Sequence, residues 1–241
     1  MSRARKRKKP ARRKSLIGRL ILILLLAGVI FQLWFAGNVF IYRYTQPTQT
    51  SFMKARYEQQ VAERPNFEIW HEWVDYGSIS INLKRAVVAA EDTKFVNHNG
   101  FDWEGIKFAL EKNMDKGKLV AGGSTISQQL AKNLFLSNDR TLLRKGQETV
   151  ITVMLESLLT KRRILELYLN YAEWGDGLFG AQAASWHYFD KPASALSEWE
   201  AARLASMLPR PVHYDKNGVN GTLRSKTGVI QQRMRQVWVP S

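Results

Sequence analysis

The sequence contains no cysteine and only four histidines among its 241 residues. The absence of cysteine excludes a disulfide framework and any thiolate metal site. Strand-type alternation is scarce and no internal repeat is found, which argues against a β-rich or repetitive fold. No helix would carry histidines at the spacing of metal ligands, so we expect no structural metal. The four are His71, His98, His187 and His213.

Acidic residues are absent from the first 19 positions, which carry ten lysines and arginines. Most of the net charge of +15 therefore lies at one end of the chain. A basic run of this kind is typical of an arm that binds nucleic acid or of the cytoplasmic flank of a membrane helix. An arm would not explain the apolar segment that follows directly, so no nucleic acid is expected as a partner.

Residues 20–41 are apolar except for Gln32 and Asn38, and a helix of this length crosses the hydrocarbon core of a bilayer, about 30 Å thick. A cleaved signal peptide is the main alternative, but its apolar region usually has about 7–15 residues. No clear small-x-small cleavage site follows. We therefore predict a basic cytoplasmic tail over 1–19 and an uncleaved, single-pass transmembrane anchor over 20–42. By the positive-inside rule, the rest of the chain would lie on the outer side of the cytoplasmic (inner) membrane, periplasmic or extracellular.

Residues 43–79 hold scattered proline, glutamine, threonine and aromatic residues without clean periodicity, which predicts a membrane-proximal linker. From residue 80 to 241 the pattern is helical nearly throughout and predicts one mainly α domain. In a first helix, Leu83, Ala86 and Val87 share one face, and Glu91 lies at the end. Further helices are predicted over 103–113, 125–135, 141–159, 163–171, 180–189 and 197–208, the last ended by Pro209 and Pro211, with one more helix near the C-terminus.

Two polar stretches stand out within this helical pattern. Residues 91–100 place two adjacent acids at the end of a helix, followed by an aromatic residue, a histidine and a glycine in a loop. Residues 122–129 begin with a glycine pair, and Thr125 and Gln128 have the spacing of a capping box. Free backbone N–H groups are expected to point out of this helix start and to suit an anion. An ordinary cap followed by a solvated basic face is an equally good interpretation.

Together with further stretches in the same order, these two resemble the peptidoglycan glycosyltransferase family in its monofunctional, single-domain form. The same domain type occurs in class A penicillin-binding proteins. The matching stretches are 91–100, 122–129 with Lys132 and Asn133, Arg144 and Lys145 with Glu148, 161–170, 177–189, 196–197 with 200–202, and 208–211. Ser127 departs from the family, which usually has threonine there, but the hydroxyl is kept. The resemblance implies a lysozyme-like, mainly α fold with a small membrane-proximal lobe.

The resemblance also implies the reaction, which is the polymerisation of glycan strands. Lipid II, a disaccharide-peptide on undecaprenyl pyrophosphate, and the growing strand would be the substrates, and the acceptor 4-hydroxyl would attack the donor with inversion. Glu91 matches the general base, and Glu148 matches a second essential carboxylate near the pyrophosphate. The substrate-binding positions carried over are Asp92, Phe95, Ser124, Gln128, Gln129, Lys132, Asn133, Arg140, Arg144 and Lys145.

Elementary chemistry agrees with such a transfer. A pyrophosphate leaving group is a weak base, so it needs stabilisation of its charge more than protonation, and the cations between residues 132 and 145 suit that need. A hydrolase that breaks a sugar–sugar bond would need a protonated acid instead. The sequence leaves open whether a divalent cation, Mg²⁺ or Mn²⁺, lies at the pyrophosphate, because Glu148 could hold one and Lys145 could take its place. Other proteins of cell-wall synthesis or division are expected as partners.

Two other functions stay open at this stage. A lysozyme-like lytic enzyme would share the fold, because a fold alone does not fix the reaction. An inactive membrane scaffold would keep the domain without its chemistry, although the intact pair of glutamates argues against it. The residues of a penicillin-binding triad also occur in order, over 51–54, 80–82 and 226–228. We reject this triad, because its nucleophile would lie in the linker and its last motif lacks a strand pattern.

Overall fold

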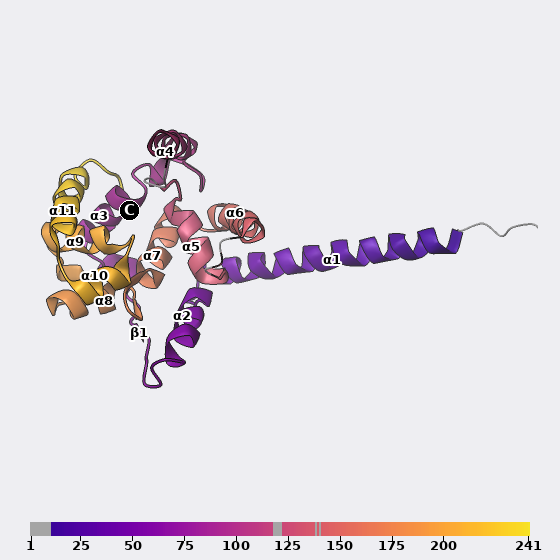
Figure 1. The fold of residues 1–241 in the computed structure, drawn as a ribbon, viewed down its shortest axis with the longest axis horizontal. Coiled ribbons are helices and arrows are strands. Elements are labelled where there is room, and N and C mark those ends of the chain that lie inside the picture. Colours follow the sequence, from indigo (N-terminus) through magenta and orange to yellow (C-terminus); the bar gives the residue numbers. More distant parts are fainter. Residues whose placement is uncertain (1–10, 118–121, 138, 140) are drawn as a thin grey trace, which may run out of the picture.

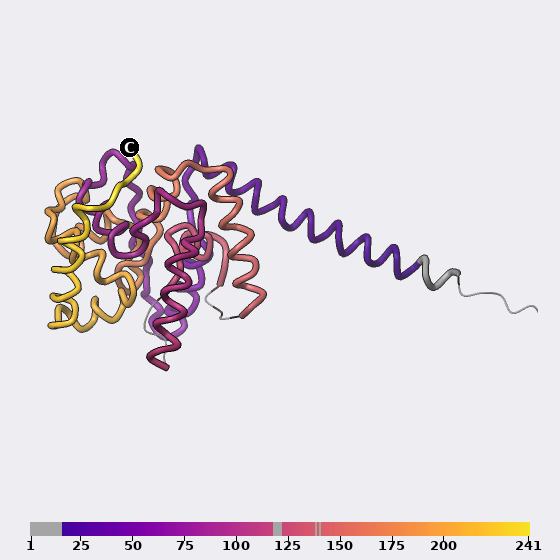
Figure 2. The backbone as a smooth tube through the Cα atoms, turned by 90° about the horizontal axis from the view of Figure 1, so that it is seen from above, coloured from indigo at the N-terminus to yellow at the C-terminus, as the bar shows by residue number. Residues whose placement is uncertain are grey.

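The computed structural model describes residues 11–117, 122–137, 139 and 141–241. A straight helix extends from one side of a helical body, as Figure 1 and Figure 2 show from perpendicular directions. This confirms the predicted mainly α fold with one long apolar helix at its N-terminal end. The first ten residues of the predicted basic tail lie outside the described residues.

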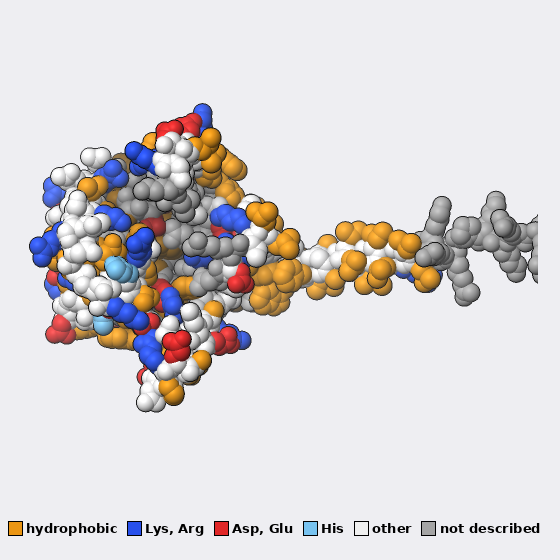
Figure 3. Space-filling model, viewed as in Figure 1, with side chains coloured by type: hydrophobic (Ala, Val, Ile, Leu, Met, Phe, Trp, Pro, Cys, Tyr) orange, Lys and Arg blue, Asp and Glu red, His pale blue; other side chains and the backbone are white. Residues whose placement is uncertain are grey.

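The straight helix is α1 (Ala11–Ile41), and its segment Leu16–Ile41 has the length and composition to cross a membrane. Its large apolar side chains are exposed along most of its length, and they continue onto the adjoining side of the body (Figure 3). Only near its C-terminal end are Phe35 and Val39 buried. There the Phe35 ring meets Phe135 edge-on, with 5.5 Å between the centroids. A helix that is apolar all round and docked at one end is suited to a lipid environment.

A pair of amides joins α1 to α6 (Leu142–Leu158). Gln32 Nε2 donates to Gln147 Oε1 at 2.9 Å, and Gln147 Nε2 donates to Gln32 Oε1 at 3.0 Å. One of the two polar residues of the apolar segment is thereby satisfied by the neighbouring helix. Since Gln147 directly precedes Glu148, the amide pair attaches α1 to the helix that carries several predicted site residues.

Replacing both of these glutamines by leucine should cost less stability than the sum of the two single replacements. A single Gln32→Leu or Gln147→Leu change leaves the other amide without its partner, at a cost of about 1 kcal/mol. The double change replaces both amides by an apolar contact. Thermal unfolding of the three variants in detergent micelles measures the effect. A double variant that loses as much stability as the two single variants added together would contradict the pairing.

Residues 43–79, predicted as a linker, are structured. Phe52 and Met53 are buried, and the helix that carries them packs against α5 (Ile126–Phe135). Thr50 caps that helix by accepting from the Met53 N–H at 3.1 Å. The periodicity did not reveal this helix because its apolar residues do not form a clear stripe along one face. The elements of this stretch are α2 (Ser51–Val61), β1 (Trp70–His71) and the 3-10 turn η1 (Tyr76–Ser78).

The body consists of two groups of packed helices beside a small sheet. In the first group, α3 (Ile81–Glu91) packs against α9 (Glu198–Met207) and α11 (Gly221–Arg233). In the second, α5 packs against α6, α2 and α7 (Lys161–Tyr171). The sheet has the order β1-β3-β2, with β3 (Leu178–Phe179) parallel to β1 and antiparallel to β2 (Glu173–Gly175). The remaining elements are η2 (Phe95–Asn97), α4 (Trp103–Lys116), α8 (Ala181–Phe189), η3 (Ala193–Ala195) and α10 (Pro211–Asn217).

Each helix predicted in the body has a counterpart, and only the ends differ by a few residues. Thr125, Thr141 and Ser197 are N-caps rather than first helical residues, and each side chain accepts a backbone N–H three positions later. The C-terminal segment forms α10 and α11, where a single helix was predicted. Pro211 begins α10, because its fixed φ and missing N–H suit the first turn of a helix.

Candidate active site

Glu91 is the last residue of α3. Ser80 caps the first turn of this helix, and the predicted face, with Leu83, Ala86 and Val87, is fully buried. The buried face fixes the rotation of the helix about its axis. The helix therefore holds Glu91 at one place at the edge of the core.

Asp92 ties the end of α3 to the start of α5. Its Oδ2 accepts from the Ile126 N–H at 3.1 Å, and its Oδ1 lies 2.9 Å from His98 Nε2. Because the Gly100 N–H donates to His98 Nδ1 at 3.1 Å, a neutral imidazole carries its proton on Nε2 and donates to Asp92. Thr125 Oγ1 closes this network by donating to the Gly100 carbonyl at 2.7 Å. Both oxygens of Asp92 thus position the two helices that meet at Glu91.

The predicted capping box at the start of α5 is confirmed. The Gln128 N–H donates to Thr125 Oγ1 at 3.2 Å, and the Thr125 N–H donates to Gln128 Oε1 at 3.0 Å. With Ile126 bonded to Asp92, two of the first three helical N–H groups are already used. The expected set of free N–H groups is therefore wrong for these positions, since the capping network satisfies them. Any anion near this helix must be held mainly by side chains.

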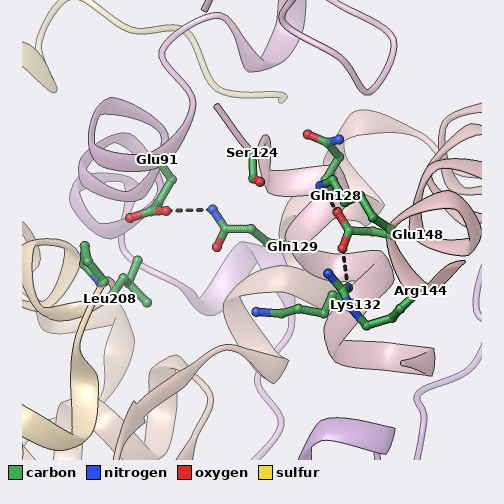
Figure 4. A pocket seen from close by; sticks show the side chains of 10 residues that line it. Glu91, Ser124, Gln128, Gln129, Lys132, Arg144, Glu148 and Leu208 are labelled. Atoms are coloured by element: carbon green, nitrogen blue, oxygen red, sulfur yellow. Dashed lines mark hydrogen bonds and ion pairs between the residues drawn. The ribbon is translucent and has the colours of Figure 1, made fainter. Parts of the chain in front are cut away.

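A pocket of about 530 Å³ lies between α3, α5 and α6. Figure 4 shows Glu91 and Glu148 on opposite sides of it, with Gln129 and Lys132 of α5 between them. Three of its side chains are cationic and two are carboxylates. The lining residues are Glu91, Ser124, Gln128, Gln129, Lys132, Arg144, Lys145, Glu148, Leu208 and Pro209.

The Glu91 carboxylate is held by one amide. Gln129 Nε2 donates to Glu91 Oε2 at 2.7 Å, as the dashed line in Figure 4 marks. Burial raises the pKa of Glu91 above its ordinary value, the Gln129 hydrogen bond opposes this shift, and the negative Asp92 adds to it. The positive charges of Lys132 and Lys226 lower the pKa of Glu91, as the Gln129 hydrogen bond does. A carboxylate with a raised pKa is a better proton acceptor than an ordinary one, which suits a general base.

Glu148 is 3% exposed, and both of its oxygens are engaged. Arg144 Nη1 donates to Oε2 at 2.6 Å, and Lys145 Nζ donates to Oε1. Arg144 and Lys145 lie about one turn before Glu148 on α6, so one carboxylate holds two cations at the wall of the pocket. Their charges are only partly neutralised, which leaves the wall attractive to an anion.

Lys132 projects from α5 between the two glutamates (Figure 4). Burial lowers its pKa, and its ammonium lies 5.6 Å from the centroid of the Phe52 ring. Among the described residues, no carboxylate lies within ion-pair distance of it. Its charge is therefore available to an anionic ligand.

A second pocket, of about 250 Å³, lies on the other side of Glu91. Glu91 and Pro209 line both pockets, and α11 contributes Lys226 and Arg233 to the second. Glu91 therefore lies between two groups of cations. Lys226 belongs to the last motif of the rejected penicillin-binding triad, and its helix replaces the strand that such a motif requires.

The structure brings together most of the predicted site residues. Eight of them line the first pocket, and Asn133 lines an adjoining one with Lys132. Phe95 is different, because its side chain is fully buried under the Lys161 ammonium, 4.5 Å from the ring centroid, and offers no surface to a substrate. Asp92 lines a third pocket near Glu91, but its oxygens serve the network described above. Arg140 lies outside the described residues.

The sequence did not single out Tyr168, Lys226 or Arg233 as site residues. Tyr168 lies in the matching stretch 161–170, where its position among apolar residues predicted a core residue. The structure does bury its side chain in the core. Lys226 and Arg233 are seven positions apart, which is about two turns of a helix. This spacing was the only sequence signal that the two cations lie on the same face of one helix.

A carboxylate with a raised pKa that lies between two groups of cations suits an enzyme of group transfer with an anionic leaving group. The sequence comparisons agree with this class. Residues 58–235 match the family described as "Transglycosylase". This match begins within α2, so it includes part of the stretch predicted as a linker.

Three curated relatives, each called "Biosynthetic peptidoglycan transglycosylase", align along nearly their whole length. The protein of Laribacter hongkongensis is 52% identical over 224 residues, which cover 93% of this chain and 98% of the relative. That of Aromatoleum aromaticum is 52% identical over 223 residues, covering 92% and 96%. That of Methylobacillus flagellatus is 51% identical over 227 residues, covering 94% and 99%. The chain belongs to the transglycosylase family.

Proposed function

We propose that the chain polymerises peptidoglycan glycan strands from lipid II. The observation that carries this proposal is the position of Glu91 between two groups of cations. A reaction that joins two pyrophosphate-linked saccharides needs one proton acceptor flanked by two anion sites. Lys132, Arg144 and Lys145 would hold the donor pyrophosphate, and Lys226 and Arg233 would hold that of the acceptor.

In the proposed reaction, Glu91 accepts the proton of the acceptor 4-hydroxyl. The hydroxyl oxygen forms a bond to the anomeric carbon of the donor strand, while the bond from this carbon to the pyrophosphate breaks. The electron pair leaves with the pyrophosphate, whose charge is stabilised by the cations of the first pocket. Attack from the face opposite the leaving group inverts the anomeric carbon. Ser124, Gln128, Gln129 and Asn133 would contact the donor sugars and phosphates.

The first pocket does not fit a divalent cation held by the protein alone. Such a cation needs several oxygen ligands, whereas both oxygens of Glu148 already have cationic partners. Nor do the described residues contain a group of three His, Cys, Asp or Glu side chains placed to hold a metal ion. We propose that Lys145 occupies the position that Mg²⁺ or Mn²⁺ would otherwise take beside Glu148.

Lys145→Ala should make polymerisation depend on a divalent cation. The change frees one oxygen of Glu148 and removes one positive charge, so added Mg²⁺ would bind between this oxygen and the pyrophosphate. We expect wild type to polymerise lipid II at a similar rate in EDTA and in Mg²⁺. The variant should lose about tenfold or more in EDTA and recover part of it with Mg²⁺. A conservative Lys145→Arg variant, which keeps the charge, serves as the control. Equal Mg²⁺ dependence in all three proteins would contradict the proposal.

The proposed location is the cytoplasmic membrane, with α1 as a single-pass anchor. The basic residues that precede the apolar segment support a cytoplasmic N-terminus and a catalytic body on the outer side. Leu142 and Leu143, at the start of α6, are 93% and 88% exposed and would meet the lipid surface. Other proteins of cell-wall synthesis or division are proposed as partners.

Product analysis tests the proposed function against its lytic alternative. Purified full-length protein in detergent micelles is given lipid II in one reaction and finished cell wall in another. We expect polymer from lipid II, detected on a gel, and no soluble fragments from the wall. Fragments without polymer would contradict the proposal and indicate a lytic enzyme. The absence of both products would favour the inactive scaffold.

A further inference from the structure

A buried hydroxyl outside the pocket is bonded to the residue that contacts Glu91. Tyr168, on α7, is 2% exposed, and its hydroxyl donates to Gln129 Oε1 at 2.9 Å. The other end of the same amide, Nε2, donates to Glu91 Oε2 at 2.7 Å. The three side chains thus form one series of hydrogen bonds from the core to the carboxylate.

These partners fix the orientation of the amide. A glutamine amide can be reversed with almost no change of shape, so its hydrogen bonds decide which end faces which group. In the reversed orientation, Oε1 of Gln129 would face the Glu91 carboxylate, and the proton of Tyr168 would have no acceptor among the described residues. Burial raises the pKa of Tyr168 well above its ordinary value, and the nearby carboxylates of Glu91 and Asp92 act in the same direction. The phenol therefore keeps its proton and stays a donor at neutral pH.

We propose that Tyr168 is a positioning residue for the reaction. Its hydroxyl holds the Gln129 amide so that an N–H always faces Glu91, and it thereby sets the pH above which the enzyme becomes active. This inference rests on the proposed function, in which Glu91 must be ionised to accept a proton. Tyr168 itself touches no reacting atom.

The ionisation of Glu91 depends on every group around it. Burial raises its pKa, whereas the Gln129 hydrogen bond and the charges of Lys132 and Lys226 lower it. Tyr168→Phe would remove the hydroxyl that holds the Gln129 amide and would leave the charges of Lys132 and Lys226 in place. The remaining charged groups in the pockets that Glu91 lines are Asp92 after the end of α3, Asp102 at the start of α4, Arg144, Lys145 and Glu148 on α6, and Arg233 on α11.

The dependence of kcat/KM on pH for lipid II polymerisation tests the inference. In Tyr168→Phe the amide loses its anchor, while the burial that disfavours the Glu91 charge remains. We therefore expect the acidic limb to move to higher pH by about half a unit to one unit. The rate below the limb should fall about three- to tenfold, and the rate on the high-pH plateau should stay within about twofold of wild type.

Tyr171→Phe is the matched control. Tyr171 is also fully buried on α7, but its hydroxyl donates to the Pro47 carbonyl, away from the pocket. It should lose comparable stability and leave the acidic limb unmoved. Equal shifts in both tyrosine variants, or no shift in Tyr168→Phe, would overturn the inference.

Gln129→Met tests the same hydrogen bonds from the other end, including the case in which Tyr168→Phe does not fold. It should move the acidic limb upward, and the double variant should show no further shift. Shifts that add in the double variant would overturn the inference. The proposed function fails separately, if wild type forms no polymer or shows no acidic limb.

Discussion

Glu91→Gln is expected to abolish detectable polymerisation of lipid II, with a loss of about 10²- to 10⁴-fold, the usual contribution of a general base. The substitution keeps the shape of the side chain and an oxygen that can accept from Gln129 Nε2, whose bond to Glu91 measures 2.7 Å in the native protein. What it removes is the group that, in the proposed reaction, accepts the proton of the acceptor hydroxyl. Gel analysis of radiolabelled lipid II products measures the effect. A variant that retains more than a tenth of wild-type activity would remove Glu91 from its proposed role.

The same variant should be at least as stable as wild type, which separates lost chemistry from lost folding. Burial raises the pKa of Glu91 in the folded state above its unfolded value. Its ionised form is therefore disfavoured in the fold, and the unfolding free energy falls as the pH rises through the folded-state pKa. Glutamine carries no such charge, so its stabilising effect should be largest at neutral pH and above. It should vanish below about pH 4, where Glu91 is mostly protonated in both the folded and the unfolded state. Thermal unfolding at several pH values measures this difference.

Glu148→Gln should reduce polymerisation by about 10²- to 10³-fold and also destabilise the protein. The amide would turn an N–H toward Arg144 or Lys145, and both cations would lose the carboxylate that holds them at the pocket wall. In the proposed reaction, misplaced cations would stabilise the leaving pyrophosphate poorly, and loss of one preorganised charge typically costs this factor. Breaking a buried pair costs about 3–5 kcal/mol. Polymerisation assays and thermal unfolding of the same preparation measure the two effects.

Glu166→Gln is the matched control for stability. Glu166 is also largely buried and accepts from an arginine on its own helix, Arg163 Nη1, at 2.6 Å, and from the Tyr76 N–H. It lines none of the pockets that contain Glu91. Its replacement should lower the unfolding temperature without changing the rate at permissive temperature. If both glutamine variants lose activity in proportion to stability, Glu148 has no special role in the reaction.

The sequence could predict those site residues that lie at the end or the start of a helix with a clear sequence pattern. The apolar face of α3 predicted a helix that ends at Glu91, and the spacing of Thr125 and Gln128 predicted the start of α5. These two helix ends lie 33 residues apart, between Asp92 and Thr125, yet Asp92 joins them directly. The resemblance carried Glu148, Arg144 and Lys145 to the same pocket, and the structure brings them there.

The rest depends on contacts that no local pattern records. Phe95 is an aromatic residue of the kind that can stack against a sugar ring. In the structure, however, Lys161, far along the chain, covers its ring. The helix α2 lacks a clear apolar stripe and is stabilised by packing onto α5. Tyr168 was indistinguishable from a core residue, because only the position of Gln129 shows what its hydroxyl does. Lys226 and Arg233 reach Glu91 because α11 folds back onto α3.

The docking of α1 on α6 through Gln32 and Gln147 has a consequence for how the enzyme would meet its substrate. With α1 in a bilayer, the amide pair would hold the catalytic pocket at a constant height above the lipid. A substrate with its own lipid tail presents its pyrophosphate at a constant height too. The search for each new disaccharide would then be a two-dimensional diffusion, governed by the number of substrate molecules per membrane area rather than per volume. Confinement of this kind raises the effective concentration without any additional contact. A tilt of α1 relative to the body would then slow the enzyme even with every catalytic residue intact.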